Sequence, residues 1–477
     1  MIDRLFHLKE HNSTVKGELV GGMTTFLSVM YIMFVNSTIL SASGMPFQGV
    51  FVATALTSAV CTLFAAIYAN LPFAMAPGMG MNSVFVNTIC LGMGYHWKEA
   101  LAITFISGLF HVFIMLSPLR KALYVAIPLH LKNAASAGLG MFISYAAIKN
   151  TGLLSYSVPA DSYIHRVDGS IIADSSTIPG ITRIFGYSQL IAIISLVSLL
   201  VLIGMQKRTG EKFWALPMSI LVGTFVGIPM NISNMRLDAG LTSMVFSEYR
   251  EVFFSFFDVP GITSIFGDFG TIVKTISIIM VLSMTNIMDS VASISGIGGI
   301  EEVTLFDDRQ HELLESKWAK SKIDRALIVN SVGGVTAPLF GSSTAITYLE
   351  SITGMISGGR TGLAGIIVSL LFLLCLPLAG FFHIIPIEAV APAMIFAGGT
   401  MITRLRKINW SDISESFPAF ITMLMMPITY NILDGMIVGL MCYIVIELFA
   451  AREKKIHPLL YIISLIYIAT KVLEFVF

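Results

Sequence analysis

Charged residues are scarce in this chain. Asp, Glu, Lys and Arg together make up 12% of the 477 residues, whereas a soluble globular domain has about 25%. Because 55% of the residues are hydrophobic, this shortage excludes an ordinary water-soluble globule. The 29 basic and 29 acidic residues cancel to a formal net charge of zero. The sequence therefore gives no electrostatic reason to expect nucleic-acid binding.

Cysteine is also rare. Cys61, Cys90, Cys375 and Cys442 stand singly inside apolar runs, without a CxxC pair and without the spacing to histidine that metal sites have. We expect them to pack as small hydrophobic side chains, and we expect neither disulfides nor a metal centre.

Long apolar runs, separated by short polar stretches, occupy most of the chain. A membrane-spanning helix needs roughly 20 mostly apolar residues, and the sequence supplies about 14 such segments. The first is too long for a signal-peptide core and has no small-residue cleavage site after it. The sequence therefore predicts an all-α polytopic membrane protein. We expect spans at Gly17–Leu40, Val50–Asn70, Pro72–Leu91, Trp97–Ser117, Leu129–Thr151, Ser188–Gln206, Phe213–Asn231, Gly270–Ser290, Asp324–Phe340, Gly341–Ser357, Thr361–Phe381, Pro386–Thr403, Ser416–Asn431 and Gly435–Ala450.

Basic residues are unevenly distributed between these spans. With the amino terminus in the cytoplasm, roughly three Lys or Arg residues lie in inner segments for each one in an outer segment, as the positive-inside rule requires. We therefore expect a multi-pass protein of the cell membrane, in a bacterium the inner membrane, with a cytoplasmic amino terminus. The long loops Gly152–Tyr187 and Ile232–Phe269 then lie outside, and the charged stretch Glu301–Arg325 lies inside. The apolar tail Leu459–Phe477 is either a further span or an interfacial helix.

The third and tenth spans contain residues that break helices. They carry LPFAMAPGMGMNSVF (Leu71–Phe85) and PLFGSSTAITYLESITGMISGGRTG (Pro338–Gly362). Helix breaks at membrane depth expose backbone groups that lipid cannot satisfy. Secondary transporters built from inverted repeats place one such segment in each half, with half-helix N-termini directed at the substrate. The pattern predicts a 7+7 inverted repeat with two broken strand/half-helix spans. The alternative is ordinary helices with close-packing Gly and Ser residues.

Two carboxylates lie at membrane depth. Asp289 lies near the predicted cytoplasmic end of the eighth span, and Glu350 lies at the start of the second half-helix, whose free N–H groups would stabilise an anion. Ionisable groups inside a membrane protein usually face a polar cavity or a partner. Asn82, near the start of the other half-helix, adds a donor and an acceptor. The alternatives are a helix end that reaches water for Asp289 and a structural cap for Glu350.

Four segments of the chain are distinctive: Thr24–Asn36, Ala76–Phe85, Phe340–Leu363 and Ser416–Ile432. They resemble the AzgA-type purine permeases, a branch of the nucleobase–ascorbate transporter superfamily. The similarity runs in register over almost the whole chain. Carried over by motif, the substrate site of that family falls on Gly80, Asn82, Asp289 and Glu350. The family usually has a second acidic residue in the eighth span, where this chain has Asn286.

The resemblance also implies an activity and a domain organisation. It implies a proton-coupled symporter that imports purine bases such as hypoxanthine, guanine or adenine by alternating access, often as a homodimer. No cofactor is implied, because the proton gradient supplies the energy. The implied boundaries are a core domain at 1–117 and 270–385, a gate domain at 118–269 and 386–450, and a C-terminal apolar tail at 451–477.

The chemistry of a purine suits these residues. A purine base is planar and neutral, with N–H donors and ring acceptors on its edge. Glu350 and Asp289 can accept from ring N–H groups, and either can carry the coupling proton, while Asn82 can donate. Phe85 and Tyr31 are candidates for the aromatic face that a planar ring prefers, and otherwise belong to the core. We expect Glu350 to contact the base directly.

Other functions are less well supported. The same fold could carry xanthine, uracil or another small solute. A channel would need a carbonyl filter or a charge ring, and neither is evident. An enzyme would need a nucleophile with its base or a metal cluster, so we expect no enzymatic activity. His111, in the middle of the fourth span, is either a proton relay or, more commonly for such a residue, a packed helix histidine.

Overall fold

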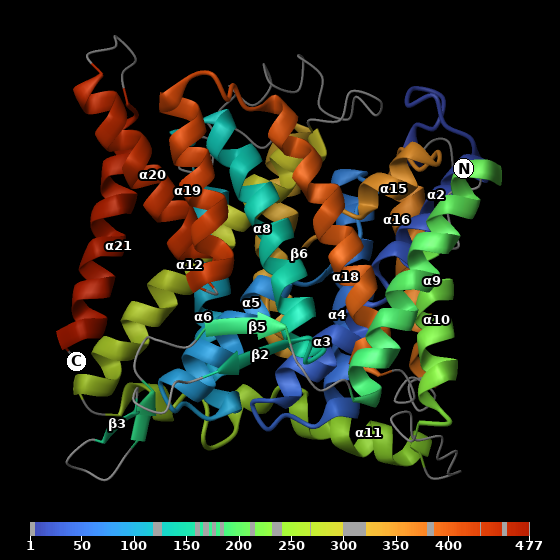
Figure 1. The fold of residues 1–477 in the computed structure, drawn as a ribbon, viewed down its shortest axis with the longest axis horizontal. Helices are drawn as coiled ribbons and strands as arrows, with labels where there is room; N and C mark the ends of the chain where they lie inside the picture. The colour runs from blue at the N-terminus through green and yellow to red at the C-terminus, as the bar shows by residue number, and fades with distance from the viewer. Residues whose placement is uncertain are drawn as a thin grey trace. The chain divides into compact units, whose positions relative to one another are not determined.

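A computed structural model describes most of the chain (Figure 1). It covers residues 5–117, 126–157, 163–165, 171–173, 178–181, 186–209, 215–230, 241–267, 269–298, 321–378, 386–429, 431–450 and 456–476. Most of the predicted inner stretch Glu301–Arg325 lies outside these residues. The chain divides into two units, one of which comprises Met1–Ile143, Arg236–His383 and Ala397–Phe477. The other comprises Ser144–Met235 and Ile384–Phe396. The division into core and gate domains stays a prediction.

A helix lies in each predicted span apart from the two broken ones. The first half of the chain contains α2 (Val15–Val29), α3 (Ile32–Ser41), α4 (Phe47–Phe64) with its π-helical continuation Ala65–Ala69, α6 (Trp97–Leu116), α8 (Leu129–Asn150), α9 (Tyr187–Thr209) and α10 (Ala215–Gly227). The second half contains α12 (Phe269–Gly298), α14 (Lys322–Phe340), α16 (Gly362–Leu374), α18 (Ile387–Met401), α19 (Ile413–Thr429) and α20 (Ile432–Phe449).

Within the described residues, four helical segments are long and apolar enough to cross a membrane. They are Val15–Ser41, Phe47–Ala69, Trp97–Leu116 and Tyr187–Arg208. Shorter apolar helices occupy other predicted spans, including Gly362–Leu374 and Ile413–Thr429. The apolar tail forms a helix, α21 (Pro458–Val476).

The structure corrects the end of the eighth span. The sequence predicted an end at Ser290, but α12 continues to Gly298. No proline follows, and Val291, Ile294 and Ile297 recur at helical spacing and are buried. Asp289 therefore lies inside a helix and is buried, so the alternative of a helix end that reaches water is wrong.

The long predicted loops contain secondary structure. In the first, β2 (Leu154–Ser157) pairs with β5 (Ile178–Ile181), and β3 (Tyr163–His165) pairs with β4 (Ile171–Ala173), both antiparallel. The second contains α11 (Leu241–Val252). The Glu248 carboxylate of α11 accepts a hydrogen bond from the Gln48 N–H at the start of α4, at 3.0 Å.

Both predicted helix breaks are present, each as a short strand followed by a half-helix. The third span contains β1 (Met75–Pro77), α5 (Met79–Ser83) and a π-helical stretch, Val84–Gly92. The tenth contains β6 (Ala345–Thr347) and α15 (Ser351–Ile356). Each follows a residue with left-handed backbone that ends the preceding helix, Asn70 at φ 50° and Gly341 at φ 87°. Glycine has no Cβ penalty in that conformation, and asparagine tolerates it better than most residues.

The two strands pair with each other in antiparallel register. Met75 lies opposite Thr347, and Ala76 lies opposite Ile346. Backbone bonds at both ends extend the pairing: the Gly78 N–H donates to the Thr344 carbonyl, and the Tyr348 N–H donates to the Ala74 carbonyl, each at 2.9 Å. The pairing brings together two segments that are about 270 residues apart in sequence.

Side chains accept hydrogen bonds from backbone N–H groups in and beside the strands that have no partner in the β1–β6 pairing. Thr62 Oγ1 accepts from the Met75 N–H at 2.9 Å, and Ser351 Oγ accepts from the Ala74 N–H at 3.0 Å. Asn330 Oδ1 accepts from the Thr347 N–H at 2.6 Å. These bonds explain how extended backbone survives inside a membrane protein, where lipid offers no partner.

The glycine-rich end of the tenth span is a packing and capping motif. The fully buried Glu18 carboxylate accepts from the N–H groups of Arg360 (3.0 Å) and Ala364 (3.1 Å) at the start of α16. Gly21 of α2 lies directly against the backbone of Gly359. The close-packing interpretation therefore applies to this part of the motif.

We expect Gly21→Ala to destabilise the protein. The added Cβ would lie 2.3 Å from the Gly359 nitrogen and 2.5 Å from its Cα, so the backbone must move, at a cost of about 1–3 kcal/mol. The melting temperature of the purified protein in detergent measures the effect. Gly204→Ala is the control, because a Cβ there meets nothing within 4 Å. Equal melting temperatures for the two variants would contradict the prediction.

Candidate functional site

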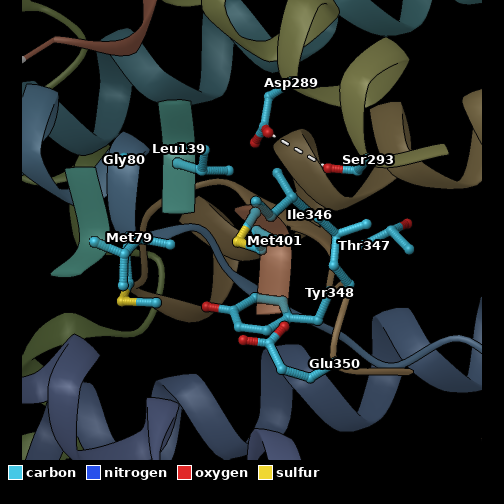
Figure 2. Close-up of a pocket in the computed structure, with 12 residues that line it drawn as sticks. Met79, Gly80, Leu139, Asp289, Ser293, Ile346, Thr347, Tyr348, Glu350 and Met401 are labelled. Carbon is cyan, nitrogen blue, oxygen red and sulfur yellow. Dashed lines mark hydrogen bonds between the residues drawn. The ribbon is translucent and has the colours of Figure 1, made fainter. Parts of the chain in front are cut away.

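Strand β6, the link from it to α15 and the start of α5 border a cavity of about 30 Å³, together with residues of α8, α12 and α18. Asp289 and Glu350 face it from opposite sides, and Tyr348 lies beside Glu350 (Figure 2). Both carboxylates that the sequence singled out therefore border one cavity. Its lining residues are Met79, Gly80, Leu139, Ile143, Asp289, Ser293, Ile346, Thr347, Tyr348, Leu349, Glu350 and Met401.

Glu350 occupies the N-cap position of α15, as expected, but its side chain makes no capping hydrogen bond. One carboxylate oxygen instead accepts from the Tyr31 hydroxyl at 2.7 Å. Tyr31 lies in the short link between α2 and α3 and is buried. A tyrosine from the first span therefore provides this side-chain hydrogen bond, and stabilisation of the carboxylate by the half-helix N–H groups stays a prediction.

Asp289 is buried on α12, with 2% of its surface exposed. Among the described residues its one hydrogen bond comes from Ser293 Oγ, one helical turn later, at a long 3.4 Å. A carboxylate offers about four acceptor positions. Most of the acceptor capacity of Asp289 is therefore open to a ligand in the cavity.

Asn82 lies on α5, fully buried, and does not line the cavity. Its Oδ1 accepts a short hydrogen bond from Ser343 Oγ, and its Nδ2 has no partner among the described residues. The amide therefore keeps a free donor close to Gly80, which does line the cavity. Phe85 is buried and outside the lining, as is Tyr31.

Tyr348 is the aromatic residue that borders the cavity, and the sequence reasoning missed it. Its hydroxyl donates to the Pro77 carbonyl at 2.6 Å, so the ring is held across the paired strands. A signal was available, because Tyr348 lies two residues before Glu350 in the broken segment, and every residue from Ile346 to Glu350 lines the cavity. Leu139, Ile143 and Met401 come from α8 and α18 and have no such signal.

His111 lies on α6, away from the cavity lining and 1% exposed. Its Nε2 lies 3.5 Å from Ser290 Oγ. Among the described residues no acidic side chain is in hydrogen-bond contact with it. A proton on this ring would be an isolated charge in a dry interior, so we interpret His111 as a packed helix histidine.

The sequence pattern of a protein family described as "Permease family" matches residues 16–438. The chain belongs to this permease family. The match confirms the resemblance to nucleobase permeases that the motifs indicated, and a permease is a transport protein, not an enzyme.

Individual relatives match the permease along nearly its whole length. It is 30% identical to the adenine permease AdeP of Escherichia coli, over 98% of this chain and 95% of that one. It is 29% identical to the guanine/hypoxanthine permease PbuG of Bacillus subtilis, over 97% and 98% of the two chains. Among solved structures, the transmembrane domain of a cyanobacterial bicarbonate transporter, BicA, aligns with a TM-score of 0.55 and 15% identity. That alignment covers 88% of this chain and 97% of the other. The likeness shows that the two proteins share a helical polytopic membrane fold.

Proposed function

We propose that the permease imports purine nucleobases such as hypoxanthine, guanine or adenine. The observation that carries the proposal is the pair of carboxylates, Asp289 and Glu350, which border one cavity beside strand β6. Relatives named as adenine and guanine/hypoxanthine permeases, which align over nearly the full chain, support the purine class.

The lining provides complementary groups for a purine. Carboxylate oxygens of Asp289 and Glu350 accept from ring N–H groups, and the Tyr348 ring offers a flat apolar surface. Ile346 and Met401 add apolar contacts. Gly80 lets the ligand approach the backbone of the first half-helix.

We further propose proton-coupled alternating access through an inverted repeat of seven spans in each half, with a cytoplasmic amino terminus. We propose that the lining of this cavity separates to admit the base. Leu139, Ile143 and Met401 come from segments assigned to the gate, and the carboxylates come from the core. Movement between these two sets opens the cavity, and the two carboxylates carry the coupling proton without a cofactor.

Uptake into proteoliposomes tests this proposal. We expect saturable uptake of labelled hypoxanthine that requires an inward proton gradient and stops when a protonophore collapses it. Unlabelled adenine or guanine should compete, whereas xanthine and uracil should compete weakly. Uptake that follows a sodium gradient would refute proton coupling. Competition by uracil alone would refute the purine assignment, competition by xanthine alone would refute the preference for hypoxanthine, guanine or adenine, and flux that does not saturate would indicate a channel.

A further inference from the structure

We propose that Asn330 is a positioning residue that fixes the distance between the Asp289-bearing helix and the cavity-lining strand β6. This inference rests on the proposed function, because the strand and the helix that Asn330 joins border the same cavity. Asn330 lies on α14, is 1% exposed, and does not line the cavity.

On one side, Asn330 holds the strand. Its Oδ1 accepts two hydrogen bonds from Thr347, one from the backbone N–H at 2.6 Å and one from the hydroxyl at 3.0 Å. Thr347 lines the cavity, but its hydroxyl hydrogen is used on Asn330. Thr347 is therefore oriented by α14 and has no hydrogen to donate to a ligand.

On the other side, Asn330 holds α12. Its Nδ2 donates to Ser290 Oγ at 2.5 Å, and Ser290 is the neighbour of Asp289 in sequence. Ser290 donates its own hydrogen to the Asn286 carbonyl at 2.7 Å, so its oxygen can only accept from outside the helix. The imidazole of His111 must then also act as a donor in its longer contact with Ser290.

An amide side chain is specifically required at this position. One atom must accept from Thr347 while the other donates to Ser290, and Asn presents an acceptor and a donor side by side. An ionised Asp accepts only, and Ala does neither. A single buried side chain thus joins α12, α14 and β6 and sets how far Asp289 lies from Tyr348 and Glu350.

The strand partner of Thr347 offers a matched control. Met75 lies opposite Thr347, and its N–H is bonded by Thr62 of α4, which also donates to the Met75 carbonyl at 3.2 Å. Thr62→Val therefore leaves a strand N–H without its acceptor, as Asn330→Ala does. The two variants differ in one respect: Asn330→Ala also removes a bond to α12, whereas Thr62 makes no bond to α12 among the described contacts.

The experiment compares Asn330→Ala, Ser290→Ala and Thr62→Val in purine uptake and in binding. We expect Asn330→Ala to raise KM and the dissociation constant of the purine by about tenfold, because the N–H and the hydroxyl of Thr347 lose their acceptor. Ser290→Ala removes only the α12 half and should raise KM less. Because the two residues belong to one network, the double variant Asn330→Ala/Ser290→Ala should be no worse than Asn330→Ala within about twofold. Thr62→Val should lower the melting temperature as much as Asn330→Ala while leaving KM unchanged.

Hydrogen–deuterium exchange of α12 gives a second readout that does not depend on transport. Backbone exchange around Asp289 should increase in Asn330→Ala and Ser290→Ala but not in Thr62→Val. An unchanged KM together with unchanged α12 exchange in Asn330→Ala would overturn the inference. Additive KM effects in the double variant would do so too. If the wild-type protein binds no purine, the proposed function is wrong, and the exchange experiment still decides the role of Asn330.

Discussion

Replacing Glu350 by Gln should lower proton-driven purine uptake about 100-fold. A hydrogen bond to a charged group contributes about 1.5–3 kcal/mol, and each 1.4 kcal/mol is a factor of about ten. Gln keeps the length of the side chain and can still accept from Tyr31, but it removes the negative charge and the proton-carrying group. The initial rate of uptake under an imposed proton gradient measures the loss.

Two comparisons make the Glu350 result specific. Tyr31→Phe removes only the 2.7 Å hydrogen bond and should lower uptake by about tenfold or less. Glu388→Gln changes a carboxylate in the first turn of α18 that does not line the cavity, and it should have little effect. Wild-type proton-driven uptake in Glu350→Gln would show that Glu350 neither binds the base nor carries the proton.

Replacing Asp289 by Asn should reduce the coupling of transport to protons more strongly than it reduces purine binding. Asp289 is buried and keeps most of its acceptor capacity free, so an amide of the same shape can still accept one bond from the base. It cannot exchange a proton between the two sides of the membrane. We expect gradient-driven accumulation to fall by about 100-fold, while exchange of labelled for unlabelled purine at equal pH falls by about tenfold or less.

Ser293→Ala is the matched control for Asp289→Asn. It removes the long 3.4 Å bond to Asp289 and leaves the carboxylate in place. Uptake within about threefold of wild type is expected, because a bond at this distance is weak. If Asp289→Asn accumulated purine against a gradient as well as Ser293→Ala does, Asp289 would not carry the coupling proton.

The length of the apolar runs located the helices well, since each predicted span outside the two breaks contains one. It failed at the end of the eighth span, where apolar length suggested Ser290 and α12 continues to Gly298. Span prediction assumes that a helix ends where the membrane does. Buried Val291, Ile294 and Ile297 show that packing against protein extends this one.

The sequence by itself determined that the protein is a membrane protein, where its helices break, and which two carboxylates border the cavity. Those conclusions follow from local properties: hydropathy, the effect of Pro and Gly on backbone, and the cost of charge in an apolar interior. Only the tertiary structure decided that Tyr31 bonds Glu350, that β1 pairs with β6, and that Asn330 links Thr347 to Ser290. These contacts join residues from 17 to 319 positions apart. Hydrogen-bond partners at such separations depend on how the helices pack, which no local pattern in the sequence records.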